Sequence, residues 1–272
     1  MNKKKGLWLY VLICISITNI LWYFGFDLHE KDEGNIISTL LLGLACFMPA
    51  IIAIIMCKLN KVKIRTMLLF PNITKSWKIY LIAILTSLFI VYAADFLPLL
   101  FFPKNVSLSP DSFTLVFFGQ IILFTIISII ESIELLGEEL GWMGYLFPKL
   151  EEEYGTISSV FIISIIRTLW HLVFIIKIDG SLFGVCNIFL SNLFLQNLLV
   201  YVTKKSNSVF PAAIVHAITN IVPVLSFVTY KEAFYNDNLV KFNLVALIPL
   251  IIVGTIFFIL LCRDKNKSKF KR

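Results

Sequence analysis

The sequence has little charge and very little histidine. Asp, Glu, Lys and Arg make up 15% of the 272 residues, and only three residues are histidine. A chain that is 58% hydrophobic, with a mean hydropathy of +0.88, is too apolar for a soluble domain of this length. No internal repeat, low-complexity segment or polar domain interrupts the pattern. The sequence therefore predicts a single membrane domain over residues 1–272.

The five cysteines have no paired spacing and form no CxxC motif. They lie within or at the ends of apolar runs, at Cys14, Cys46, Cys57, Cys186 and Cys262. This placement excludes a disulfide framework or a thiolate metal knuckle as the organising principle of the fold. Their expected role is that of small apolar residues.

Apolar runs of about 20 residues, long enough to cross the hydrocarbon core of a bilayer, recur along the whole chain. The expected spans are 7–26, 36–57, 79–102, 113–134, 159–178, 181–203, 209–230 and 242–262. The predicted fold class is therefore all-α, a polytopic membrane helix bundle with about eight transmembrane helices.

The basic residues behind the formal net charge of +7 are distributed along the chain as the expected topology requires. Basic residues gather at 3–5, 58–78, 204–205 and 263–272, whereas the first connection, around 27–33, is acidic. Cytoplasmic loops carry an excess of Lys and Arg, so both termini are expected in the cytoplasm. The expected partner of these charges is the lipid bilayer, and no nucleic acid is expected. The Ile-, Lys- and Asn-rich composition favours a bacterial plasma membrane.

Two isolated polar residues stand in the otherwise apolar first three spans. Asn19 lies in the first and Asp95 in the third. The favoured interpretation for each is an interhelical hydrogen bond or a position near a water-filled rim, because such contacts are common in helical bundles.

A run of glutamates follows the apolar part of the fourth span. Glu131, Glu134 and Glu138 fall at i, i+3 and i+7, on one side of a continuing helix, with Glu139 about 100° away. For Glu131 and Glu134 an acidic side facing water is favoured. Carboxylates at membrane depth cost roughly 2.5–3.5 kcal/mol each, so the adjacent pair Glu138 and Glu139 is a functional candidate as well as an interfacial one.

Two later spans each carry a polar pair at i, i+4. These pairs are Arg167 with His171 and His216 with Asn220. A single histidine in a span is more often a satisfied polar residue than a catalytic one. The coincidence of two such pairs with a glutamate pair favours one shared polar cavity, since each group needs partners at low dielectric.

At these positions the chain resembles the CPBP (CAAX protease and bacteriocin-processing, Abi or Rce1-type) intramembrane proteases. Their motifs are EExxxR, FxxxH and HxxxN or HxxxD on successive helices. The matching residues, from Gly137 to Asn220, are Glu138-Glu139 in GEELGWMGYLFPKL, His171 in LWHLVF, and His216 with Asn220 in HAITN. The resemblance implies an endopeptidase core over about 113–230.

The resemblance also implies roles for these residues. Glu138 would activate a water molecule that His171 helps to hold, and His216 and Asn220 would stabilise the oxyanion. Glu139 would support the site. No cofactor is required by this mechanism, and the implied substrate is a membrane-associated peptide or protein.

The chain departs from the family pattern at two positions. Met143 stands where the motif has arginine, and Arg167 stands where it has phenylalanine. We hypothesise that Arg167 supplies the missing cation to Glu139 from the neighbouring helix. On this hypothesis Arg167→Phe abolishes function, and adding Met143→Arg restores it.

Alternative functions stay open at this stage. Glu138, His171 and His216 would be the three ligands of a catalytic zinc ion, although no HExxH is present. A member without activity would act as a membrane binding protein, for example in bacteriocin self-immunity. A transporter function would explain the intramembrane charges, but the sequence lacks the repeat symmetry that is typical of transporters.

Overall fold

The computed structural model describes residues 3–110, 112–221, 227–231 and 238–264. Helices dominate these residues, as the sequence predicts. The α-helices are α1 (Lys3–Lys31), α2 (Ile36–Leu59), α3 (Ile73–Phe101), α4 (Leu115–Glu139), α5 (Phe147–Tyr154), α6 (Thr156–Trp170), α7 (Leu172–Ile178), α8 (Leu182–Ser206), α9 (Phe210–Ile221) and α11 (Leu239–Arg263). A 3₁₀ turn η1 (Ile64–Met67), a π-helical segment η2 (Leu140–Leu146) and two short strands, β1 (Val106–Leu108) and β2 (Val228–Tyr230), complete the described elements.

The described residues confirm an all-α polytopic bundle, while the expected count of about eight transmembrane helices stays a prediction. Within the described residues, six helices are long and apolar enough to cross a membrane, and α6 with α7, bent by 52°, makes up to seven. The difference lies in the expected span 209–230. There α9 has 12 residues, about 18 Å at the usual helical rise, too short to cross a bilayer alone. Residues 222–226 of that span lie outside the described residues.

The fourth expected span continues well past its predicted end. Leu115–Tyr154 runs as 40 helical residues through α4, η2 and α5. This is the continuing helix that the glutamate spacing indicates. Both carboxylates of the Glu138–Glu139 pair therefore lie inside a long helical segment, at the junction of α4 and η2.

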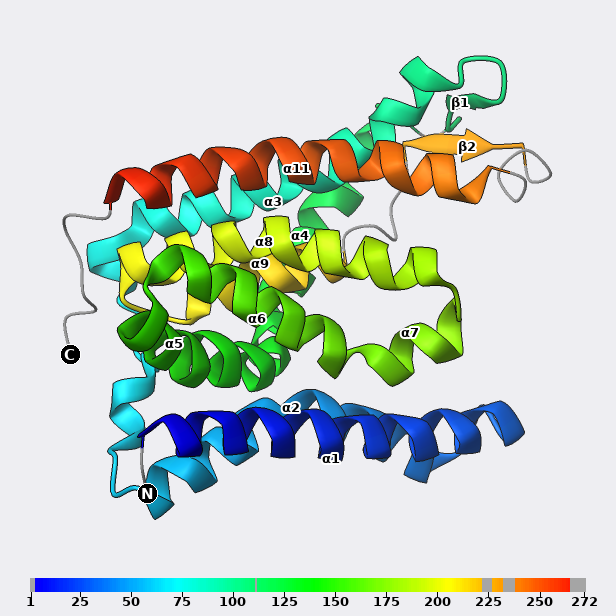
Figure 1. Cartoon of the computed structure of the whole chain (residues 1–272). Helices are drawn as coiled ribbons and strands as arrows, with labels where there is room; N and C mark the ends of the chain where they lie inside the picture. Colours follow the sequence, from blue (N-terminus) through cyan, green and yellow to red (C-terminus); the bar gives the residue numbers. More distant parts are fainter. Residues whose placement is uncertain (1–2, 111, 222–226, 232–237, 265–272) are drawn as a thin grey trace.

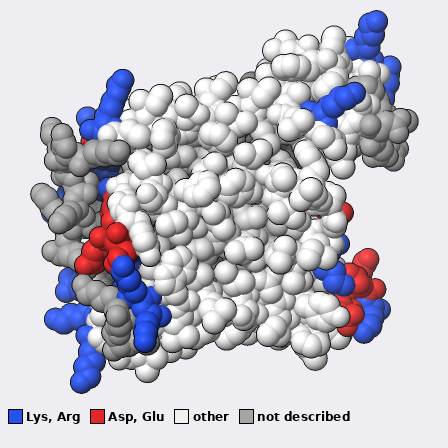
Figure 2. All heavy atoms as spheres, viewed as in Figure 1, with Lys and Arg blue, Asp and Glu red and all other residues white. Residues whose placement is uncertain are grey.

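The beginning of α1 and the end of α11 lie at the same end of the bundle (Figure 1). Charged side chains gather at the two ends, and a broad band between them shows almost none (Figure 2). Ion pairs connect neighbouring segments at the end where α1 begins and α11 ends: Lys4 with Glu153, Lys204 with Glu151, and Lys205 with Asp264. The uncharged band and the ionic ends are the surface of a multi-pass membrane protein.

Helices α1 and α2 form a hairpin along one side of the bundle (Figure 1). Glycines let the glutamate-bearing segment approach this hairpin closely. A Cβ on Gly141 would lie 2.4–2.6 Å from atoms of Pro49, and one on Gly144 would lie 2.6 Å from the Met67 carbonyl oxygen. Backbone contact of this kind is the usual role of small residues between membrane helices.

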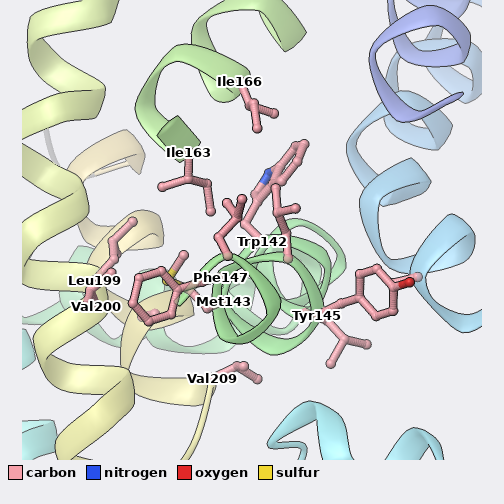
Figure 3. Packing of buried hydrophobic residues seen from close by; sticks show 14 of the residues in the cluster. Trp142, Met143, Tyr145, Phe147, Ile163, Ile166, Leu199, Val200 and Val209 are labelled. Atoms are coloured by element: carbon pink, nitrogen blue, oxygen red, sulfur yellow. The ribbon is translucent and has the colours of Figure 1, made fainter. Parts of the chain in front are cut away.

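The π-helical segment η2 is surrounded by packed side chains (Figure 3). Trp142, Met143, Leu146 and Phe147 are fully buried. Met143 lies on the side of Leu199 and Val200 of α8 in this view, whereas Trp142 lies near α6 (Figure 3). The segment carrying the motif is thus held on several sides.

At the opposite end of the bundle, β1 pairs antiparallel with β2 over three residues. An aromatic cluster lies beneath this ribbon and includes Phe117, Phe227 and Phe242. The Asp95 carboxylate accepts a hydrogen bond from the main-chain N–H of Phe227. The polar residue expected in the third span therefore binds a main-chain group beside the ribbon.

Candidate active site

The site begins with two buried carboxylates at the end of α4. Glu138 is 6% exposed and Glu139 is fully buried. The π-helical segment η2 starts at the next residue, and such insertions occur frequently at functional sites. Two carboxylates in such surroundings need cationic or hydrogen-bonding partners.

The cation comes from α6. Arg167, 2% exposed, places Nη1 2.8 Å from Glu139 Oε1, and its Nη2 lies 3.8 Å from Glu138 Oε2. The ion pair that the sequence analysis expects between Arg167 and Glu139 is therefore present. A single guanidinium faces both carboxylates.

The third contributor is His216 on α9. Its Nδ1 lies 2.9 Å from Glu139 Oε1, 3.5 Å from Arg167 Nη2 and 3.9 Å from Glu138 Oε2. Small residues on the same helix, Ala213 and Ala217, are fully buried, so α9 lies close against its neighbours. Three separate segments thus bring Glu138, Glu139, Arg167 and His216 together, and we call these four residues the charged cluster.

His171 lies next to this cluster at the bend between α6 and α7. Its Nδ1 is 2.8 Å from the carbonyl oxygen of Arg167. A carbonyl can only accept, so Nδ1 carries the hydrogen and Nε2 of the neutral ring is the acceptor. The rings of Trp170 and Trp22 lie 4.5 and 5.6 Å from the imidazole, between ring centres. None of the described contacts joins the His171 ring directly to a carboxylate.

Asn220 and the two earlier glutamates are not part of the charged cluster. Asn220 is exposed on the last turn of α9, and its side chain makes none of the described contacts with the cluster. Glu131 and Glu134 are exposed on α4, and that they face water stays a prediction.

Several buried polar atoms around the cluster make no hydrogen bond with the described residues. They are Glu138 Oε2, Glu139 Oε2, Arg167 Nε, Trp142 Nε1 and Trp170 Nε1. Buried polar atoms are normally satisfied by protein or by ordered water. The concentration of these atoms here identifies the surroundings of Glu138 as the polar centre of the membrane domain.

The zinc alternative needs three ligands close enough to share one ion. Within the described ranges, no group of three or more His, Cys, Asp or Glu side chains is arranged to hold a metal ion. Glu138, His171 and His216 therefore do not form a ready ligand set in this arrangement.

Two buried amide side chains on α8 (Leu182–Ser206), Asn192 and Gln196, were not among the residues expected from the sequence. Asn192 donates to Thr168 Oγ1 of α6 at 3.2 Å, and Gln196 Nε2 lies 3.4 Å from the Met143 sulfur. Gln196 Oε1 has no hydrogen-bond partner among the described residues. Their i, i+4 spacing is the same signal that singles out the histidine pairs and would have found them.

Residues 115–222 match the family model described as type II CAAX prenyl endopeptidase Rce1-like. The matched segment contains every member of the charged cluster and His171. This segment belongs to the Rce1-like family. The resemblance found in the motifs is therefore confirmed, and the match supports, at family level, a CAAX-type intramembrane endopeptidase. The search of curated proteins found no match. Helices α1, α2 and α3 precede the Rce1-like segment.

Proposed function

We propose that this protein hydrolyses a peptide bond in a membrane-associated peptide or protein, with Glu138 as the group that activates water. The observation that carries the proposal is the position of Glu138 Oε2. This oxygen is buried, lies 3.8–3.9 Å from Arg167 Nη2 and His216 Nδ1, and makes no described hydrogen bond. A water molecule bound there would face a base on one side and cationic or imidazole groups on the other.

The charge of the cluster supports proton transfer. Two carboxylates and one guanidinium sum to −1 when His216 is neutral, and one added proton makes the cluster neutral. A low-dielectric site favours the neutral arrangement. The cluster therefore tolerates one added proton during the reaction.

The reaction moves one proton of the attacking water to Glu138 and then on to the leaving amine. Glu138 takes a proton from water as the water oxygen attacks the peptide carbonyl carbon, forming the new C–O bond. The C–N bond then breaks, and the proton passes to the leaving amine. Charged His216, held through Nδ1 by Glu139, would donate from Nε2 to the oxyanion.

The remaining residues would have supporting roles. His171 would accept a hydrogen bond from the water through Nε2. Asn220 would reach the oxyanion together with His216 if a bound substrate draws in the last turn of α9. Glu139 and Arg167 would fix the orientation of His216.

We also propose that no metal takes part. A zinc ion held by Glu138, His171 and His216 would require these side chains to rearrange. Treatment with 1,10-phenanthroline is therefore expected to leave hydrolysis unchanged. Loss of hydrolysis that zinc restores would favour the metal mechanism instead.

The class of substrate follows from the family. A prenylated C-terminal peptide is the natural first probe, and leader or signalling peptides are the second. We place the protein in a bacterial plasma membrane with both termini cytoplasmic, as the basic loops favour.

Glu138→Gln is the decisive test, because it removes the base and keeps the shape. The matched control is Glu134→Gln, which changes an exposed carboxylate one turn earlier on α4. Purified protein in vesicles would be given a farnesylated CAAX peptide, and cut membrane peptides would be compared in cells. Hydrolysis is expected to fall by about 10²-fold or more in Glu138→Gln only. Equal activity in both variants would overturn the assignment.

The second candidate is a non-catalytic binding protein, for instance one conferring bacteriocin immunity. The observation that favours it is Met143, which replaces the arginine of the family motif. A cellular phenotype that survives Glu138→Gln would support this reading, since binding depends on shape more than on the base.

A further inference from the structure

The bend at His171 interrupts the main-chain hydrogen bonds between α6 and α7. A continuous α-helix would pair the Val173 N–H with the Leu169 carbonyl oxygen, four residues earlier. Neither group makes this bond. Instead both bind the side chain of Asn19 from α1, and this confirms the interhelical contact expected of that residue.

The Asn19 amide fits between the two separated groups. Its Oδ1 accepts from Val173 N at 2.8 Å, and its Nδ2 donates to the Leu169 carbonyl oxygen at 3.2 Å. Nδ2 also lies 2.8 Å from the Ile15 carbonyl oxygen of its own helix. One side chain therefore binds both main-chain groups: it satisfies the Val173 N–H and adds a donor to the Leu169 carbonyl oxygen, which also faces the His171 N–H. Unpaired main-chain groups in a membrane cost several kcal/mol.

The two hydrogen bonds of Asn19 form a bridge across the bend at His171. In the sequence, His171 lies two residues after Leu169 and two residues before Val173. The backbone of His171 is at φ −82° and ψ 5°, outside the helical region. The same bend brings its Nδ1 to the Arg167 carbonyl oxygen. Trp22, less than one turn from Asn19 on α1, places its ring 5.6 Å from the imidazole.

We propose that Asn19 is a positioning residue for His171. It would hold the bend between α6 and α7 and so fix which imidazole nitrogen faces the water bound at Glu138. This inference rests on the proposed function. It assigns part of the site to α1, which lies outside the matched segment 115–222.

The first test reads the imidazoles directly and needs no substrate. The chain has three histidines, His29, His171 and His216, so histidine-labelled protein gives three sets of ¹⁵N side-chain signals by NMR. In Asn19→Ala we expect the hydrogen-bonded Nδ1–H signal of His171 to shift or vanish. The signals of His216 and His29 should stay in place, which also reports that the protein is folded.

The second test measures kcat and KM on a farnesylated CAAX peptide. Asn19→Ala is expected to lower kcat by about 10²-fold with KM nearly unchanged, as a displaced catalytic group does. Asn19→Asp, which keeps the acceptor for Val173 N–H, should recover part of the loss. The control is Asn197→Ala, because buried Asn197 donates to Leu193 within its own helix.

The two tests separate the inference from the proposed function. Unchanged His171 signals in Asn19→Ala would overturn the positioning role whatever the activity. An Asn197→Ala variant that loses kcat as strongly would also overturn it. Absence of hydrolysis by the wild-type protein would count against the proposed function, while the NMR result would still decide the role of Asn19.

Discussion

Arg167 Nη1 lies 2.8 Å from Glu139 Oε1, although 28 positions separate the two residues in the sequence. The family motif places its arginine four residues after the second glutamate, on the same segment. Here the cation comes from α6, so the ion pair also ties α6 to the junction of α4 and η2. The ion pair in this chain is therefore a tertiary contact and not a local one.

We expect Arg167→Met to destabilise the protein by about 3–5 kcal/mol, because it leaves Glu139 buried without a cation. The double variant Arg167→Met with Glu139→Gln removes both charges and should recover most of this loss. Unfolding of the purified protein in mixed micelles would measure both changes. Equal destabilisation in the single and double variants would show that the pair contributes no coupling energy.

The second prediction concerns the position where the family has arginine. In an Arg167→Phe background, Met143→Arg is expected to restore stability and hydrolysis. The unpartnered Gln196 Oε1 beside the Met143 sulfur would accept a hydrogen bond from the new guanidinium.

Met143→Arg alone is the control for this rescue. It should destabilise the protein, since it adds a second buried cation to a fully packed position. Thermal unfolding of Arg167→Phe, Met143→Arg and the double variant would measure whether the second change restores stability. A double variant no better than Arg167→Phe would mean that position 143 cannot reach Glu139.

Much of the fold and of the charged cluster could be predicted from the sequence. Long apolar runs predict helices, because a segment inside a bilayer must pair its main-chain N–H and C=O groups with one another. Ionisable residues in such runs must find one another, and this brings Glu139, Arg167 and His216 together. The catalytic roles of Glu138 and His171 stay predictions.

Other features depend on tertiary contacts that no local pattern reports. The shortness of α9 is hidden because residues 209–230 are mostly apolar, a pattern shared by helices that cross the membrane and helices that pack inside the bundle. The π-helical form of Leu140–Leu146, where Gly141 and Gly144 lie close to Pro49 and Met67, is not indicated by helix propensity. The bridge made by Asn19 joins residues more than a hundred positions apart.

The third prediction tests the topology. Lys61, beside the end of α2, is expected on the cytoplasmic side, and Lys104, after α3, on the opposite side. In intact cells an impermeant maleimide should label Lys104→Cys above the wild-type background and should label Lys61→Cys only after permeabilisation. The reverse pattern would invert the orientation and place both termini outside.

The last prediction concerns the contact between the π-helical segment and α2. Gly141→Ala would set a methyl group 2.4–2.6 Å from atoms of Pro49, a distance at which the backbone must move. We expect a loss of about 1–3 kcal/mol in stability. Hydrolysis should fall too, because Glu138 and Glu139 precede this turn directly.

Gly119→Ala on α4 is the matched control, since a methyl group there meets nothing within 4 Å. It should be neutral or stabilise the helix by roughly 0.5–1 kcal/mol, the usual advantage of Ala over Gly. Unfolding and hydrolysis of both variants would be measured side by side. If Gly141→Ala behaved like Gly119→Ala, close packing on Pro49 would not be what holds the glutamates in place.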